Sequence, residues 1–178
     1  MNKVARLNPK KTALLVIDVQ KALFTRPDPI FKAYQMIEVI NALVDRAHLY
    51  GLPVIYIQHA NQSILAEGSD GWKFHPGISP AASDLSIRKT QGNSFLGTTL
   101  QGDLEARGVE NVIVTGLVTH QCIRSTCLGG VKLGYNVFLV QGGHSNYSKH
   151  PEAMIEQREG ELENAGVYIV TPEQIDLN

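Results

Sequence analysis

Short apolar runs separated by helix-length intervals constrain the fold of this chain most strongly. Five runs lie at residues 13–17, 54–57, 112–115, 137–140 and 167–170, and a weaker strand candidate lies at 85–88. Hydrophobicity that is continuous rather than alternating is typical of strands buried on both faces, as in a parallel sheet covered by helices. We therefore predict six strands at these positions.

Helices are predicted between the strands. Asp28 and Pro29 indicate a helix start, the first as N-cap and the second at the first helical position. Thr98 and Gln101 form a capping-box pattern that opens a short helix. The predicted helices span residues 29–50, 98–108, 120–133 and 151–165.

Alternating strands and helices predict an α/β fold, a three-layer Rossmann-like sandwich with a six-stranded, mainly parallel sheet. With strands numbered along the chain, we take the order as 3-2-1-4-5-6. No repeat or linker divides the 178 residues, so we expect a single domain spanning residues 1–178. Ligands of such sheets bind beyond the carboxyl ends of the strands where the order reverses, here between the first and fourth strands.

Charge and composition exclude several classes of function. The chain has 16 Lys and Arg against 17 Asp and Glu, whereas nucleic acids and anionic membranes require concentrated positive charge. No apolar run approaches the ~20 residues of a membrane span, and residues 1–11 contain no signal-peptide core. Two cysteines do not make a secreted disulfide scaffold. We expect a cytoplasmic protein that acts on a small, uncharged molecule, without nucleic-acid or membrane partners.

Asp18 and Cys122 follow the first and fourth predicted strands, at the expected ligand crevice. With Thr119 as N-cap, Cys122 falls in the first turn of a helix, where unpaired N–H groups and the positive dipole end favour a thiolate. The alternatives are an Asp18 that caps a turn and a Cys122 that is a small buried apolar residue. Cys127 is expected to be such a core residue.

Lys89 follows the third predicted strand, where a lysine usually extends toward solvent. Together with Asp18 and Cys122, however, it makes a set suited to acyl transfer. A thiolate attacks a carbonyl carbon, a carboxylate accepts and returns protons, and an ammonium offsets negative charge. Backbone N–H groups at the helix start would hold the oxyanion.

Patterns of other enzyme classes do not fit the sequence. A dinucleotide-binding domain needs a glycine-rich turn after the first strand, and residues 18–21 contain no glycine. Residues 92–97 have one residue too many for a Gly-x-Ser-x-Gly elbow. A thiol oxidoreductase would need Cys-x-x-Cys, whereas Cys122 and Cys127 are five positions apart.

Several motifs resemble the isochorismatase-like cysteine hydrolase superfamily, which includes nicotinamidases and N-carbamoylsarcosine amidohydrolases. They occur in the order of that superfamily and span nearly the whole chain. The matching segments are Leu14-Leu15-Val16-Ile17-Asp18-Val19-Gln20, then Lys89, then Phe95-x-Gly97-Thr98-x-Leu100, then Val114-Thr115-Gly116-Leu117-Val118-Thr119-x-x-Cys122.

The resemblance implies a catalytic triad of Asp18, Lys89 and Cys122. It also implies a cis peptide bond between Leu117 and Val118 and an oxyanion hole formed by the backbone N–H groups of Val118 and Cys122. Members of the superfamily are commonly oligomers, so a homo-oligomer is expected.

Four further residues are predicted to bind the substrate. Gln20 and Phe24 lie close to Asp18 in sequence, and an amide and an aromatic ring would suit a small planar molecule. Trp72, in the long loop at residues 58–83, and Thr119 complete the set. Loops of this length often cover a binding site, although their aromatic residues equally suit a small core of their own.

Neither a metal nor another cofactor is expected. Metal-dependent nicotinamidases carry an Asp-x-His element after the second strand, and this chain has Ile57-Gln58-His59 without that Asp. His59 and His75 alone make a poor metal site, so nicotinamide is not the expected substrate.

The cysteine favours hydrolysis of a C–N bond in an amide, imide, ureide or carbamoyl compound through a thioester acyl-enzyme. Two alternatives remain. One is a non-catalytic protein on the same fold that binds a metabolite or a partner. The other is a vinyl-ether hydrolase of the isochorismate type, which does not need the cysteine.

Overall fold

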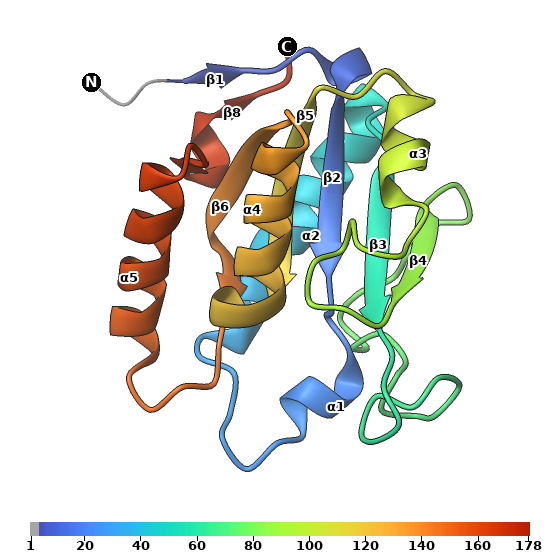
Figure 1. Ribbon diagram of the computed structural model, residues 1–178, viewed down its shortest axis with the longest axis vertical. Helices are drawn as coiled ribbons and strands as arrows, with labels where there is room; N and C mark the ends of the chain where they lie inside the picture. Colours follow the sequence, from blue (N-terminus) through green and yellow to red (C-terminus); the bar gives the residue numbers. More distant parts are fainter. Residues whose placement is uncertain (1–3) are drawn as a thin grey trace.

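The computed structural model describes residues 4–178, and residues 1–3 of the predicted single domain lie outside the described residues. Six strands form one sheet in the order β4-β3-β2-β5-β6-β7, with every neighbouring pair parallel (Figure 1). The predicted order is confirmed, and the sheet is wholly rather than mainly parallel. The strands are β2 (Thr12–Ile17), β3 (Val54–His59), β4 (Leu85–Lys89), β5 (Asn111–Leu117), β6 (Asn136–Ser145) and β7 (Tyr168–Val170).

Helices cover both faces of the sheet, with α2 behind it and α3, α4 and α5 in front (Figure 1). Along β2, Leu14 and Val16 belong to the core cluster that contains residues of α2. Leu15 and Ile17 belong to the cluster on the opposite face. Burial on both sides accounts for the unbroken apolar run. The helices are α2 (Ala33–Tyr50), α3 (Leu100–Glu105), α4 (Arg124–Lys132) and α5 (Pro151–Asn164).

Short elements complete the fold. The parallel pair β1 (Ala5–Arg6) and β8 (Ile175–Asp176) joins the two ends of the chain. Helix α1 (Lys21–Phe24) follows β2, and a π-helical turn (Thr119–Ile123) links β5 to α4. Within residues 4–178, no helix is both long enough and apolar enough to cross a membrane.

Two predicted helix starts are wrong. Lys32 has a φ of 48°, in the left-handed region, so the helix predicted from residue 29 begins only at Ala33. The Thr98 hydroxyl accepts from the Leu100 N–H at 3.2 Å, as a cap would, and donates to the Ser94 carbonyl at 2.6 Å. The Gln101 side chain instead donates to Glu105, so the predicted capping box does not close, and the helix begins at Leu100.

Strands β2 and β5 approach each other closely at their carboxyl ends. Gly116 has a φ of 114°, and a Cβ there would collide with the Ile17 carbonyl oxygen, so only glycine fits. Ile17 pairs with Gly116, which brings the segments that follow both strands to one edge of the sheet. The polar residues of the site project from this edge.

Candidate active site

Asp18 directly follows β2 and turns the chain out of the sheet. Its N–H still donates to the Ile57 carbonyl at 2.8 Å, as a strand residue would. Its φ of 54° lies in the left-handed region, which costs a non-glycine residue about 1–2 kcal/mol. Backbone strain of this kind clusters at functional sites. The Asp18 side chain is 3% exposed.

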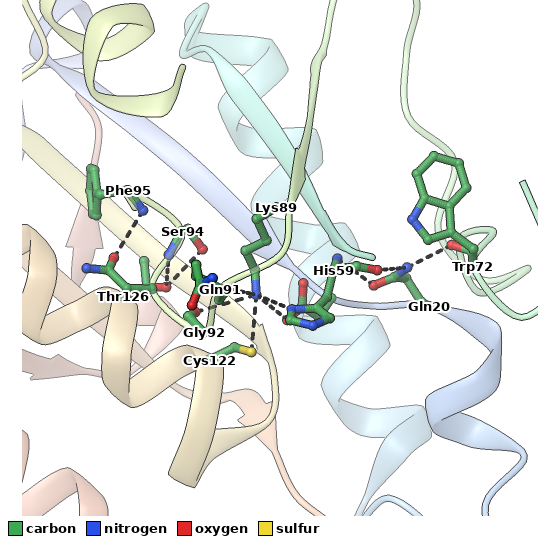
Figure 2. Close-up of polar contacts among 12 residues, drawn as sticks. Gln20, His59, Trp72, Lys89, Gln91, Gly92, Ser94, Phe95, Cys122 and Thr126 are labelled. Atoms are coloured by element: carbon green, nitrogen blue, oxygen red, sulfur yellow. Dashed lines mark hydrogen bonds and ion pairs between the residues drawn. The ribbon is translucent and has the colours of Figure 1, made fainter. Parts of the chain in front are cut away.

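Lys89, the last residue of β4, is buried among polar partners instead of extending toward solvent. Its Nζ lies 2.9 Å from Asp18 Oδ2 and 3.1 Å from Cys122 Sγ. It also lies 3.3 Å from His59 Nδ1 and within hydrogen-bond distance of the carbonyl oxygens of Gln91 and Gly92 (Figure 2). The ammonium therefore bridges the carboxylate that follows β2 and the sulfur that follows β5, and Lys89 itself comes from the other side of β2.

Cys122 is the fourth residue of the π-helical turn, so it lies in the first helical turn as predicted, but the N-cap is Val118 and not Thr119. Burial and the adjacent Asp18 carboxylate raise the pKa of Cys122 to about 12, although Lys89 acts in the opposite direction. A pKa raised in this way favours the protonated thiol near neutral pH, whereas the helix start alone would favour a thiolate. Nucleophilic attack from this state requires a proton acceptor beside the sulfur.

Asp18 offers such an acceptor. Oδ2 accepts from Lys89, whereas Oδ1 is buried and has no hydrogen-bond partner within residues 4–178. The carboxylate and Cys122 Sγ belong to a group of donor atoms that lie within 4.8 Å of one another. A buried oxygen without a partner is costly, and a proton from the thiol would satisfy it.

The sulfur faces a cavity of about 170 Å³. This volume is well below the roughly 300–1,000 Å³ of sites for drug-sized ligands, which limits the cavity to a small molecule. The peptide bond between Leu117 and Val118 on its wall is cis, as the resemblance implied. The cavity is lined by Asp18, Leu23, Arg26, His59, Asn61, Ile64, Leu65, Val118, Gln121, Cys122 and Tyr147.

Gln20 and Trp72, predicted to bind substrate, lie outside the lining of this cavity. The Gln20 amide accepts from the His59 N–H and donates to the carbonyls of His59 and Trp72, so its hydrogen bonds are already used. Trp72 accepts there through its backbone, and its indole points away from Cys122 (Figure 2). Gln20 therefore positions the backbone of His59, the last residue of β3.

Phe24 and Thr119 also lie outside the cavity lining. The Phe24 ring packs against His75 of the long loop, with 4.3 Å between ring centroids. Thr119 is fully buried, and its hydroxyl pairs with His144 Nδ1 at 2.9 Å. Sequence proximity to Asp18 and Cys122 did not indicate which way these side chains point.

The sequence analysis missed Arg26 and Tyr147 on the cavity wall. Tyr147 follows β6, which extends to Ser145 rather than to the predicted residue 140. Had the sequence shown that β6 ends at Ser145, the rule that ligands bind beyond the carboxyl ends of strands would have identified Tyr147 as a candidate. No local pattern marks Arg26, which lies in the loop after α1.

The donor atoms of the site do not fit a metal ion. Asp18, His59 and Cys122 each offer one ligand atom within 4.8 Å of the others. The Lys89 ammonium already contacts all three, so a cation would have to occupy the place of an existing positive charge. His75, the other histidine considered, accepts instead from the Gly77 N–H at 3.1 Å.

The cluster of carboxylate, ammonium and thiol lies at the carboxyl edge of a parallel α/β sheet, which is where proteins of this architecture bind their ligands. The model of the isochorismatase domain matches residues 12–173. The chain therefore belongs to the isochorismatase family of hydrolases.

Characterised and uncharacterised relatives both match the chain. Streptothricin hydrolase from Streptomyces noursei is 30% identical over 137 residues, covering 76% of this chain and 50% of the relative, so the chain spans about half the length of that protein. Ureidoacrylate amidohydrolase RutB from Acinetobacter baylyi is 27% identical over 168 residues, covering 73% of this chain and 69% of the relative. The uncharacterised family protein YddQ from Bacillus subtilis is 34% identical over 137 residues, covering 70% and 72%.

Solved structures share the fold. A cysteine hydrolase from Pseudomonas syringae pv. phaseolicola superposes with a TM-score of 0.86 at 20% identity, covering 98% of this chain and 95% of the other. A putative isochorismatase from Burkholderia xenovorans superposes with a TM-score of 0.83 at 28% identity, covering 94% and 86%.

Proposed function

We propose that this chain hydrolyses a C–N bond of a small amide, imide, ureide or carbamoyl compound, with Cys122 as nucleophile and a thioester as intermediate. One observation carries the proposal. The buried Lys89 ammonium is within hydrogen-bond distance of both Asp18 Oδ2 and Cys122 Sγ, and Asp18 and Cys122 line a cavity. A nucleophile, a proton acceptor and a fixed positive charge are thereby within reach of one bound carbonyl group.

In the first step Cys122 Sγ forms a bond to the carbonyl carbon, and the carbonyl π electrons move to the oxygen. The thiol proton passes to Asp18, whose Oδ1 has no other partner within the described part of the chain. We assign the oxyanion to the backbone N–H groups of Val118 and Cys122, since both residues line the cavity.

In the second step the oxyanion re-forms the carbonyl and the C–N bond breaks. Asp18 returns the proton to the departing nitrogen, so ammonia or a neutral amine leaves and a thioester remains. Water then attacks the thioester, Asp18 accepts the water proton, and the C–S bond breaks as that proton returns to sulfur. The net reaction consumes one water molecule and restores the thiol.

Lys89 keeps the charge of the site balanced throughout. The negative charge resides first on Asp18, then on the oxyanion, then on Asp18 again, and the ammonium lies beside Asp18 and the sulfur that carries the acyl group. A buried charge next to a developing charge acts in a low dielectric, where its effect is larger than in water.

One relative, named an amidohydrolase of ureidoacrylate, supports cleavage of a C–N bond, and another, named streptothricin hydrolase, supports hydrolysis. A cytoplasmic location, a homo-oligomeric assembly and the absence of a cofactor stay predictions.

An ammonia-release screen over amides, ureides and carbamoyl compounds tests the proposal. The wild-type protein should release ammonia or amine from at least one class, and Cys122→Ser should abolish the release. Cys127→Ser, five residues away, is the matched control and should retain it. Equal release of ammonia or amine by Cys122→Ser would contradict the role of Cys122 as nucleophile. No release by any of the three proteins would contradict C–N hydrolysis and favour the non-catalytic binding protein or the vinyl-ether hydrolase, whose reaction yields no nitrogen product.

A further inference from the structure

Arg26 differs from every other arginine of the chain. Six of the seven arginines have a carboxylate or a backbone carbonyl as partner. Arg26 has neither an ion pair nor a hydrogen-bond acceptor within residues 4–178, and its Nε is buried without a partner. The six paired arginines are Arg6, Arg46, Arg88, Arg107, Arg124 and Arg158.

The Arg26 guanidinium is nevertheless held in place. It lies 4.2 Å from the ring centroid of Tyr147, in a cation–π contact. Stacking of this kind fixes the plane of the guanidinium without using its N–H groups, which stay free for a planar, bidentate acceptor. Tyr147 itself packs edge-on against His120, with 6.0 Å between ring centroids.

Arg26 also carries the uncompensated charge of the cavity. Asp18 and Lys89 lie 2.9 Å apart and cancel each other. Burial and the nearby Lys89 lower the pKa of His59, so its ring is neutral near pH 7. The remaining lining residues are uncharged, namely Leu23, Asn61, Ile64, Leu65, Val118, Gln121, Cys122 as its thiol and Tyr147.

A free guanidinium in the same small cavity as the nucleophile calls for an anion of matching shape. We propose that Arg26, held by Tyr147, binds a carboxylate of the substrate, so the substrate is a small amide or ureide that also carries an acid group, as N-carbamoyl amino acids do. The assignment rests on the proposed function. A negatively charged substrate differs from the uncharged substrate that the sequence predicted from the net charge of −1. The net charge of the whole chain does not show that one cation at the site has no acidic partner.

Leu23, Ile64 and Leu65 give the cavity an apolar wall. Such a wall suits the short hydrocarbon segment that would join the carboxylate to the reacting C–N group. The cavity of about 170 Å³ restricts that segment to a few atoms.

Two alkylating reagents of nearly equal size test the charge preference directly. Iodoacetate carries a carboxylate and iodoacetamide a neutral amide, and both modify thiols by displacement of iodide. The measured quantity is the ratio of their rate constants at Cys122, followed by mass spectrometry of the peptide that contains it. Arg26→Gln should slow iodoacetate about tenfold while iodoacetamide stays within about twofold. Arg88→Gln, which breaks a pair with Glu67 outside the cavity lining, should leave the ratio unchanged.

An unchanged ratio in Arg26→Gln would overturn the proposal. Failure of both reagents to modify Cys122 would count against the proposed function instead. A binding measurement would then test whether Arg26 binds a carboxylate. In the Cys122→Ser protein, N-carbamoylglycine should bind about tenfold more tightly than its neutral amide, and Arg26→Gln should remove that difference. Equal affinity for the two compounds, or no binding of the acid, would overturn the proposal. Thermal melting of each variant checks that it is folded.

Discussion

The π-helical turn Thr119–Ile123 and helix α4 after it each contain one cysteine, and the two cysteines have different surroundings. Burial raises the pKa of both Cys122 and Cys127. Cys127 is fully buried within the apolar core between α4 and the sheet, whereas Cys122 lies against the Lys89 ammonium and the Asp18 carboxylate. We therefore expect the reactivity of Cys122 to depend on a proton acceptor beside the thiol and not on a stable thiolate.

The sharpest contrast between the two cysteines should be their rate of alkylation in the folded protein. Cys122 borders the cavity, whereas Cys127 is exposed only when the core opens. Iodoacetamide should therefore modify Cys127 at least about 10³-fold more slowly than Cys122, since core opening costs most of the folding free energy. Peptide mapping measures both rates in one sample, with a denatured sample as control. Comparable rates in the native state would contradict the assignment of Cys127 to the core.

The next largest expected effect is the pH dependence of the rate of Cys122 alkylation. A thiol whose pKa is raised to about 12 is protonated at neutral pH, so its thiolate fraction grows with pH. The alkylation rate should rise about tenfold per pH unit from about pH 7 to about pH 10 without reaching a plateau. A plateau below about pH 8 would show a preformed thiolate, as the helix-dipole argument from the sequence expected.

Removing one member of the buried ion pair should destabilise the fold strongly. Asp18 and Lys89 side chains are 3% and 0% exposed, so either single variant leaves an uncompensated buried charge. Lys89→Met and Asp18→Asn should each lower the free energy of unfolding by about 3–5 kcal/mol. Asparagine also tolerates the left-handed backbone of residue 18.

The double variant Asp18→Asn/Lys89→Met is the control for this pair. It should regain most of the lost stability, because neither buried charge remains, yet it should stay inactive. Additive losses in denaturant melts, with no recovery in the double variant, would contradict the account of the ion pair.

The smallest expected effect is on stability at the cysteines themselves. Serine at position 127 places a hydroxyl in the apolar core, which should cost about 1–3 kcal/mol. Serine at position 122 keeps Lys89 as a partner and should change stability by less than about 1 kcal/mol. Thermal melts of the two variants make the comparison, and a larger loss for Cys122→Ser would reverse it.

The sequence predicted the sheet and the Asp18, Lys89 and Cys122 cluster for one reason. Apolar runs locate parallel strands, and the carboxyl ends of those strands meet at one edge, so residues that follow them converge. The structure brings these three side chains together as the prediction requires. The distance from β4 to the crevice is spanned by the full length of the Lys89 side chain.

The rest of the cavity could not be predicted in the same way. Whether Gln20 faces a substrate or the His59 backbone depends on a contact 39 residues away along the chain. Arg26 lies in a loop without periodicity, and its isolation from acidic partners is a property of the folded surface. The left-handed conformation of Lys32 likewise follows from loop closure and not from a local residue preference.

The central claim is that Cys122 carries the acyl group during hydrolysis. The most direct test mixes the protein with a compound from which it releases ammonia or an amine. Acid stops the reaction within one turnover, and mass spectrometry of the peptides then shows which residue carries the acyl group. The account predicts the mass of the acyl group on the peptide that contains Cys122, and its absence from the same peptide of Cys122→Ala. Turnover with no acyl group on Cys122, together with undiminished hydrolysis by Cys122→Ala, would contradict it.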